Sequence, residues 1–144
     1  ELRTGSVLPI LSTATGRGFL AYMPPSLTES LVKAELAEAE ERGKTYGVQA
    51  LKSHVLKHQV AKADGESLPG ISALAVPIID FEKRVRIVVS AIGRRRVFDA
   101  SFNSETAAAL KTLRRAFRSG SAARREFNNA KCVHINPSIE TRIQ

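Results

Sequence analysis

Two histidines and one serine are the side chains of this sequence that could do chemistry. His54 and His58 stand four residues apart, a spacing that puts two imidazoles on one face of a helix and allows them to share a metal ion. Ser90 could act as a nucleophile if one of these histidines served as its base. No third metal ligand with suitable spacing accompanies the histidines, and the residues around Ser90 do not support a nucleophile. We therefore expect a solvent-facing histidine pair, no metal site and no catalytic residues, and we keep a small enzyme only as an alternative function.

A run of small residues at positions 12–16 offers a different chemistry, the binding of an anion. Ser12 or Thr13 can cap a short helix that Pro24-Pro25 ends. The first N–H groups of such a helix have no partner within the helix and can bind a carboxylate or another small anion. The same small residues would also let the helix pack tightly against a sheet, which is the simpler interpretation without further information.

The chain carries a net charge of +8, from 22 Lys and Arg against 14 Asp and Glu. The excess lies late in the sequence, in arginines at positions 94–96, 114, 115, 118, 124 and 125. Aromatic residues make up only 6% of the chain, and no helix-turn-helix, zinc finger or ribonucleoprotein motif is visible. A solvated helix face and a charged strand end explain the arginines most simply. A non-specific nucleic-acid-binding domain remains an alternative function that rests on the arginines alone.

The composition is that of a globular domain. A chain of 144 residues with 43% apolar residues suits one domain with a real core. No apolar run is long enough to cross a bilayer, and the sequence does not open with a signal peptide. Cys132 is the only cysteine, so an internal disulfide is excluded and a reducing, cytoplasmic location is expected.

Residues 68–93 predict a β-hairpin. Two apolar runs rich in β-branched residues, Ile71–Ile79 and Val85–Ile92, flank the polar connector Asp80–Arg84. The first residue of the connector can bond the backbone two residues further on, which favours a turn. Pro77 cannot donate a ladder hydrogen bond, so it should lie at an edge or a bulge. We expect a further strand at Val60–Ala63, followed by a turn-rich loop.

Three other segments have the apolar spacing of helices, at 27–42, 45–58 and 104–118. In the first, Thr28 is a candidate cap, Leu27 and Leu31 belong to the predicted apolar stripe, and Glu35 lies on an acidic outer face. The last should bury a stripe that ends at Phe117. Strands that alternate irregularly with helices indicate an α/β (α+β) class.

Two separated stretches resemble one protein family. Residues 3–21, RTGSVLPILSTATGRGFLA, are similar to the family pattern R-x-G-x-x-x-P-L-H-A-T-A-x-G-K-A-L-L-A, with Leu11 in place of the histidine. Residues 70–80, GISALAVPIID, and SAIG at 90–93 resemble G-x-x-A-I-A-x-P-V-x-D and S-V-S-G. AKADGE at 61–66 looks like the acidic loop of the family. On this resemblance, which covers about residues 2–118, the chain is similar to the C-terminal effector-binding domain of the IclR family of bacterial transcriptional regulators.

The resemblance implies a GAF-like fold, with a mainly antiparallel sheet flanked by helices and a small-molecule pocket on one side. In the family the effector lies between the start of the short helix, the acidic loop and the hairpin strands. Carried onto matching positions, the implied effector-binding residues are Thr13, Ala14, Thr15, Asp64, Ala73, Ser90 and Ile92. Family members that sense glyoxylate or pyruvate have a cysteine in place of Ala73 and a second serine in place of Ile92. A larger, partly apolar organic acid or an aromatic effector therefore suits this chain better.

The resemblance also implies partners. A winged helix-turn-helix domain and the first strands of the sensor domain would precede Glu1, and DNA would be bound only through that separate domain. Family members commonly form dimers or tetramers through these domains, so self-association is expected. No cofactor and no membrane are implied. We expect residues 1–120 to form the sensor domain and residues 121–144 a C-terminal extension.

Overall fold

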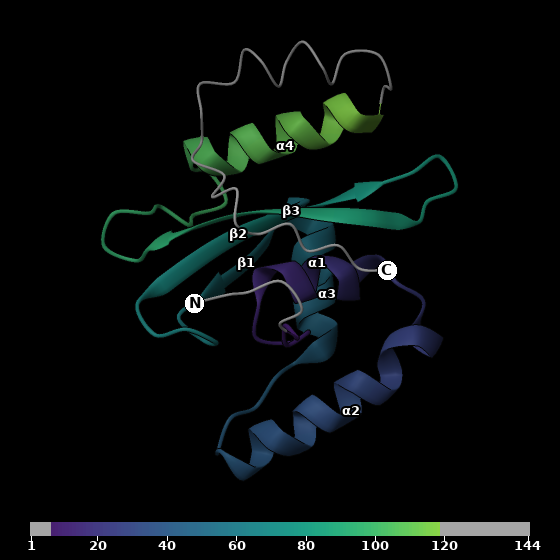
Figure 1. Ribbon diagram of the computed structural model, residues 1–144, viewed down its shortest axis with the longest axis vertical. Coiled ribbons are helices and arrows are strands. Elements are labelled where there is room, and N and C mark those ends of the chain that lie inside the picture. The colour runs from purple at the N-terminus through teal and green to yellow at the C-terminus, as the bar shows by residue number, and fades with distance from the viewer. Residues whose placement is uncertain (1–6, 119–144) are drawn as a thin grey trace.

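The computed structural model describes residues 7–118, which form four helices and three strands (Figure 1). In chain order these are α1 (Ala14–Tyr22), α2 (Pro25–Glu41), α3 (Val48–His58), β1 (Ala61–Asp64), β2 (Ile71–Ile79), β3 (Val85–Arg94) and α4 (Glu105–Arg118). The predicted α+β class, with an antiparallel sheet flanked by helices, is confirmed. The expected extension at 121–144 lies outside the described residues and stays a prediction.

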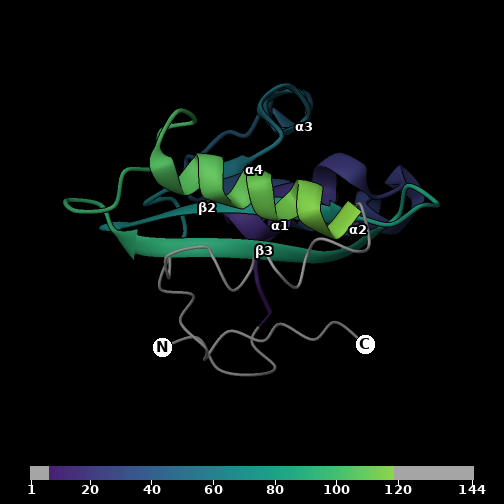
Figure 2. The ribbon, with the colours of Figure 1, turned by 90° about the horizontal axis from the view of Figure 1, so that it is seen from above.

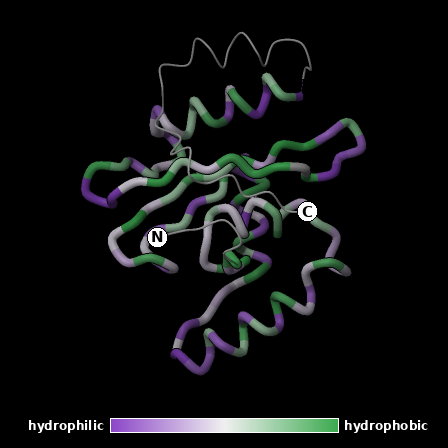
Figure 3. Tube along the Cα trace, in the orientation of Figure 1, coloured by the Kyte–Doolittle hydropathy of each residue, from purple (hydrophilic) through white to green (hydrophobic). Residues whose placement is uncertain are grey.

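The three strands form one antiparallel sheet in the order β1-β2-β3. The predicted hairpin is confirmed: β2 and β3 pair from Ile71 opposite Arg94 to Ile79 opposite Val85. Asp80 holds the connecting turn, because its Oδ1 accepts hydrogen bonds from the N–H groups of Glu82 at 2.9 Å and Arg84 at 2.8 Å. Figure 3 shows hydrophobic colouring along β2 and β3 and hydrophilic stretches in the loops at both ends.

Pro77 lies in the middle strand, and the reason it is tolerated there is local. β1 has only four residues and begins with Ala61 opposite Ala75, so the β1 side of β2 has no strand partner at Pro77 within residues 7–118. The register between β2 and β3 also shifts between Ile78 and Ile79, directly after the proline. Proline therefore occupies an edge beside a bulge, as predicted.

Helices cover both faces of the sheet. In Figure 1, α4 lies above the sheet, while α1 and α3 lie below it. Figure 2, which looks onto α4, shows this helix lying along β2. The helix α2 lies beyond α1 and α3, at the end of the molecule opposite α4 (Figure 1). None of the helices in residues 7–118 has the length and hydropathy that a membrane crossing requires.

The alternation of side chains along β2 divides the core into two halves. Leu74, Val76 and Ile78 belong to the cluster that includes Leu110 of α4. Alanines on the other face pack with α1 and α3, in a cluster of Ala14, Val55, Ala61, Ala63 and Ala75. A face lined mainly with methyl groups lets the short helix α1 approach the sheet closely.

The helix predicted over 27–42 is α2, but three details of its prediction are wrong. The helix begins at Pro25, so Thr28 is a buried residue of its first turns and not its cap. Leu27 and Leu31 are 61% and 54% exposed and do not form a buried stripe. Glu35 points inward, where its carboxylate accepts hydrogen bonds from the backbone N–H groups of residues 10 and 11 at 2.6 and 2.8 Å.

Smaller differences concern the other helices. The helix expected to start at residue 45 starts at Val48, after Gly47. In α4 the buried residues are Ala107, Leu110 and Ala116, whereas Phe117 is 45% exposed. Both differences follow from the tertiary context, because a helix buries the face that its neighbours cover and not every apolar residue it contains.

Candidate functional site

Thr13 is the N-cap of α1. The sequence predicts a cap at either Ser12 or Thr13, and the structure shows that it is Thr13. Its Oγ1 accepts a hydrogen bond from Gly16 N at 2.9 Å and donates one to Pro9 O at 2.6 Å. Both bonds serve the local backbone, so this hydroxyl helps to set the direction in which the chain enters the helix. Thr13 therefore positions the start of α1, and its hydroxyl is already engaged.

Thr15 and Ser90 are brought together by the fold. Thr15 lies in the first turn of α1 and Ser90 in the middle of β3, and their hydroxyl oxygens are 2.6 Å apart. The hydrogen bond fixes α1 against the face of the sheet that carries the alanine cluster, where Ser90 faces Ala75 of β2. These two predicted residues therefore form a polar pair on a largely apolar surface.

Ala14, Ala73 and Ile92 surround this pair. Ile92 is two residues beyond Ser90 on β3, so both side chains point to the same face. Ala73 pairs with Ile92 across the hairpin and packs in the same cluster as Ala14. Ile92 remains 37% exposed. Five of the seven predicted residues thus share one region, an apolar surface with two hydroxyls at the start of α1.

Asp64 does not belong to this group. It is the last residue of β1 and not part of a loop, and it pairs with Ser72 on β2. Its carboxylate accepts a hydrogen bond from Ser72 Oγ at 2.5 Å. It also forms an ion pair with Arg95, whose Nε lies 3.1 Å from Asp64 Oδ1. These partners, Ser72 first, hold the pKa of Asp64 below its ordinary value. The next residue back, Ala63, is the one that faces Ala73 and the alanine cluster.

The family resemblance implied Asp64 as a contact of an acidic loop, whereas residue 64 is the last residue of strand β1. In a strand, neighbouring residues point to opposite faces, so an error of one position exchanges the two sides of the sheet. The alternation of Ala61 and Ala63 with Lys62 and Asp64 was the available signal, since the alanines are the core-facing residues.

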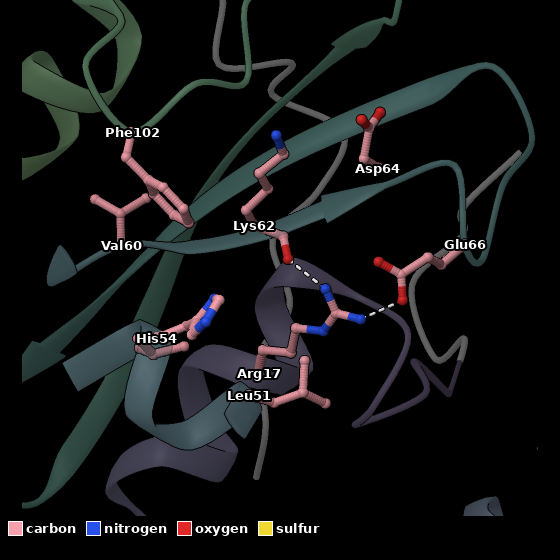
Figure 4. Close-up of a pocket in the computed structure, with 9 residues that line it drawn as sticks. Arg17, Leu51, His54, Val60, Lys62, Asp64, Glu66 and Phe102 are labelled. Atoms are coloured by element: carbon pink, nitrogen blue, oxygen red, sulfur yellow. Dashed lines mark hydrogen bonds and ion pairs between the residues drawn. The ribbon is translucent and has the colours of Figure 1, made fainter. Parts of the chain in front are cut away.

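Arg17 is a structural residue that the sequence analysis missed. It is 7% exposed, and its guanidinium donates to Leu11 O at 2.7 Å, to Lys62 O at 2.5 Å and to the carboxylate of Glu66 (Figure 4). One side chain thereby ties α1 to the segment before it, to the outer edge of β1 and to the loop after β1. The signal was present, because Arg17 is the only charged residue of α1 and stands between two glycines.

A small pocket lies beside the outer edge of β1 (Figure 4). Its volume is about 170 Å³. Its lining combines apolar side chains of α3, of the residue before β1 and of the segment before α4 with polar and charged groups. The lining residues are Arg17, Leu51, His54, Val55, Val60, Lys62, Asp64, Glu66 and Phe102. Of the predicted effector-binding residues, only Asp64 lines it.

The histidine pair is partly used by the core. His58 stacks on Phe102 with ring centroids 3.9 Å apart, while His54 lies edge-on to His58 at 6.1 Å. Burial, with the nearby cations Lys57, His54 and Lys111, lowers the pKa of His58. No cluster of three metal-ligating side chains occurs within residues 7–118. In the same part of the chain Ser90 bonds to Thr15 and to neither histidine, so the nucleophile–base pair is not assembled.

The fold and this arrangement define an α+β domain, with helices on both faces of an antiparallel sheet (Figure 1). The family model described as the C-terminal domain of the bacterial transcriptional regulator IclR matches residues 1–119, so the chain belongs to this family. The comparison with curated proteins gives no match.

Solved structures agree with the family. HmgR of Pseudomonas aeruginosa is 29% identical, with a TM-score of 0.71, over 82% of this chain and 47% of HmgR. An IclR transcriptional regulator of Alicyclobacillus acidocaldarius is 26% identical, with a TM-score of 0.63, over 78% of this chain and 46% of its own. The C-terminal domain of Escherichia coli KdgR has the same fold, with a TM-score of 0.60 and 23% identity. This match covers 77% of this chain and 70% of the KdgR domain. The chain thus spans about half the length of the first two regulators.

Proposed function

We propose that this chain is the effector-binding domain of a bacterial transcriptional regulator and that its effector binds beside Thr15 and Ser90. The observation that carries the proposal is their hydrogen bond, 2.6 Å long, on a surface that is otherwise apolar. Two hydroxyls that satisfy each other can be exposed to a ligand at little cost, because the ligand replaces one hydrogen bond with others.

The chemistry of the surface limits the ligand to a small organic acid or aromatic molecule with an apolar part. Ala73 and Ile92 offer only apolar contacts, which favours a carbon skeleton at that end. At the other end, the N–H of Gly16 is bonded to Thr13 Oγ1, and the N–H groups of Ala14 and Thr15, which have no partner within the helix, can bind a carboxylate beside the two hydroxyls. A ligand that is polar throughout would lose its hydration against Ala73 and Ile92 without replacement.

The proposed effect of the ligand is on DNA binding by a separate winged helix-turn-helix domain of the complete protein. The matched regulators are about twice as long as the aligned region, which leaves room for such a domain in them. We further propose that the complete protein acts in the cytoplasm as a dimer or tetramer.

The test is a thermal-shift screen of the 144-residue chain with small aromatic and aliphatic acids. A ligand at a concentration of 100 Kd should stabilise the fold by about 2.7 kcal/mol. Ser90→Ala and Thr15→Val should weaken the effect, and Ser53→Ala, on the exposed surface of α3, is the matched control. The site is wrong if a stabilising acid is found whose affinity neither substitution changes. In the complete protein the same acid should change the affinity for operator DNA, measured by fluorescence anisotropy.

The alternative function, non-specific nucleic-acid binding, finds less support in the fold. Arg95 is paired with Asp64, and Arg114 donates hydrogen bonds to the Tyr22 hydroxyl at 3.0 Å and to Gln59 O at 3.4 Å. These arginines are used to join elements of the domain. Salt-dependent binding of random DNA by the isolated chain would favour this alternative.

A further inference from the structure

We infer that the pocket beside the outer edge of β1 (Figure 4) is a second binding site, which takes a small aromatic carboxylate on the ammonium group of Lys62. The inference goes beyond the proposed function, because the pocket contains neither Thr15 nor Ser90. The anchoring side chains also differ in direction: Lys62 pairs with Leu74, whose side chain belongs to the α4 half of the core, whereas Ser90 pairs with Ala75 of the alanine cluster.

The first argument is the balance of charge in the pocket. Its four charged side chains are Arg17, Lys62, Asp64 and Glu66. Arg17 is paired with Glu66, and Asp64 is satisfied by Ser72 and by an ion pair with Arg95 from outside the pocket. The four charges of the lining sum to zero, but with Arg95 included the group carries one net positive charge, and both carboxylates have a direct partner other than Lys62.

That charge belongs to Lys62. Within residues 7–118 its ammonium group makes no hydrogen bond and no ion pair, although it lowers the pKa of Asp64 and of Asp99 from a distance. Asp99 lies outside this pocket and accepts a hydrogen bond from Ser101 N at 2.9 Å. An ammonium group without a direct partner beside a partly enclosed apolar space is suited to bind the carboxylate of a ligand.

The second argument is the apolar wall. Leu51, Val55, Val60 and Phe102 are the apolar residues of the lining, to which Lys62 also belongs. One face of the Phe102 ring is covered by His58 at 3.9 Å, which holds the ring in place. A fixed aromatic ring beside aliphatic side chains favours a flat, apolar ligand body, which can contact Phe102 by stacking or edge-to-face packing.

The third argument is size. The volume of about 170 Å³ lies below the range of about 300–1,000 Å³ that is usual for drug-sized ligands. The pocket therefore suits a molecule with a single ring and one carboxylate, for which benzoate is a suitable probe.

The test is titration of the 144-residue chain with benzoate, followed by NMR chemical shifts and by isothermal titration calorimetry. We expect saturable shifts at Val60, Lys62 and Phe102. Benzyl alcohol, which keeps the ring without the charge, should bind at least tenfold more weakly. Lys62→Met should weaken benzoate binding at least tenfold, with Lys62→Gln as a second variant if the first does not fold. Lys52→Met, on α3 and outside the pocket, is the matched control and should bind normally.

Ser90→Ala separates this inference from the proposed function. Benzoate binding that Lys62→Met weakens at least tenfold and that Ser90→Ala leaves unchanged supports the second site. Shifts confined to Thr15 and Ser90 would overturn the second site while supporting the proposed function. Shifts at Val60 and Phe102 that Lys62→Met leaves unchanged, or that do not saturate, would overturn the assignment of Lys62 as the anchor.

Discussion

The hydroxyl oxygens of Thr15 and Ser90 lie 2.6 Å apart although 75 positions separate the two residues in the sequence. Their hydrogen bond joins the first turn of α1 to the middle of β3, and it is the polar contact around which the proposed effector site is built. Whether the two side chains act as a unit can be measured directly.

A double-mutant cycle of Thr15→Val and Ser90→Ala should reveal this coupling. Each single substitution is expected to lower the free energy of unfolding by about 1 kcal/mol, because it removes one of the two hydroxyls and leaves the other without its hydrogen-bond partner. The double variant should cost less than the sum, with a coupling energy of about 0.5–1.5 kcal/mol. Urea unfolding of the four proteins measures it. Strict additivity would mean that the hydrogen bond contributes nothing to the fold.

Replacement of Arg17 should be among the most destabilising changes in α1. Arg17→Ala removes the donor from Leu11 O and Lys62 O and leaves Glu66 unpaired, so we expect a loss of about 3 kcal/mol in the free energy of unfolding. Arg17→Lys should recover only part of it, because an ammonium group cannot reproduce the planar array of donors.

The control for Arg17 is Arg42→Ala. Arg42 pairs with Glu38 at 3.5 Å, and both side chains are largely exposed. Loss of this surface pair should cost less than about 1 kcal/mol. Equal effects of Arg17→Ala and Arg42→Ala in urea unfolding would contradict the structural role assigned to Arg17.

Two glycines of α1 should respond oppositely to alanine. A Cβ at Gly16 would lie 2.4 Å from Pro9 O and 2.5 Å from Ile10 Cα, so the backbone would have to move, at a cost of about 1–3 kcal/mol. A Cβ at Gly18 would meet only the Val88 side chain, at 3.1 Å, and alanine favours the helix by up to about 1 kcal/mol. Thermal unfolding of Gly16→Ala and Gly18→Ala compares them, and similar melting temperatures would contradict the close approach at Gly16.

Stability should fall as the pH drops below the ordinary histidine pKa of 6.5. Burial, with the nearby cations, lowers the pKa of His58 in the folded chain, so the unfolded chain takes up the proton first. The loss begins near pH 6.5 and ends below the folded pKa, where both states are protonated. The lowered pKa values of Asp64 and Asp99 add a separate loss only at more acidic pH, below their ordinary value of 3.8.

NMR titration of the histidine side chains checks this directly, and His58 should titrate below its ordinary value. Unfolding measured between pH 5 and 7 in His58→Phe, which keeps a ring on Phe102 but cannot ionise, should lose most of the dependence. His54→Gln is the control and should retain most of it, because burial, the largest cause of the lowered pKa of His58, is unchanged. A His58 pKa at or above 6.5 would show that the stacked ring is not kept neutral by its surroundings.

Local patterns were enough to predict most elements of the domain. The hairpin followed from two β-branched runs around Asp80, and the start of α1 from the capping preference of Thr13, because both signals act through the backbone within a few residues. The family resemblance then selected five residues that the fold brings together around Thr15 and Ser90.

The remaining features were decided by tertiary structure. The family resemblance implied Asp64 as a contact of an acidic loop, but the pairing of β1 with β2 extends the strand to Asp64 and places Ala63, not Asp64, in the alanine cluster. Leu27 and Leu31 are apolar yet exposed, since no described element covers that face of α2. The sequence by itself therefore determined the element types and the family. Only the packing of elements decided which side chains meet, because burial and pairing depend on partners that are distant along the chain.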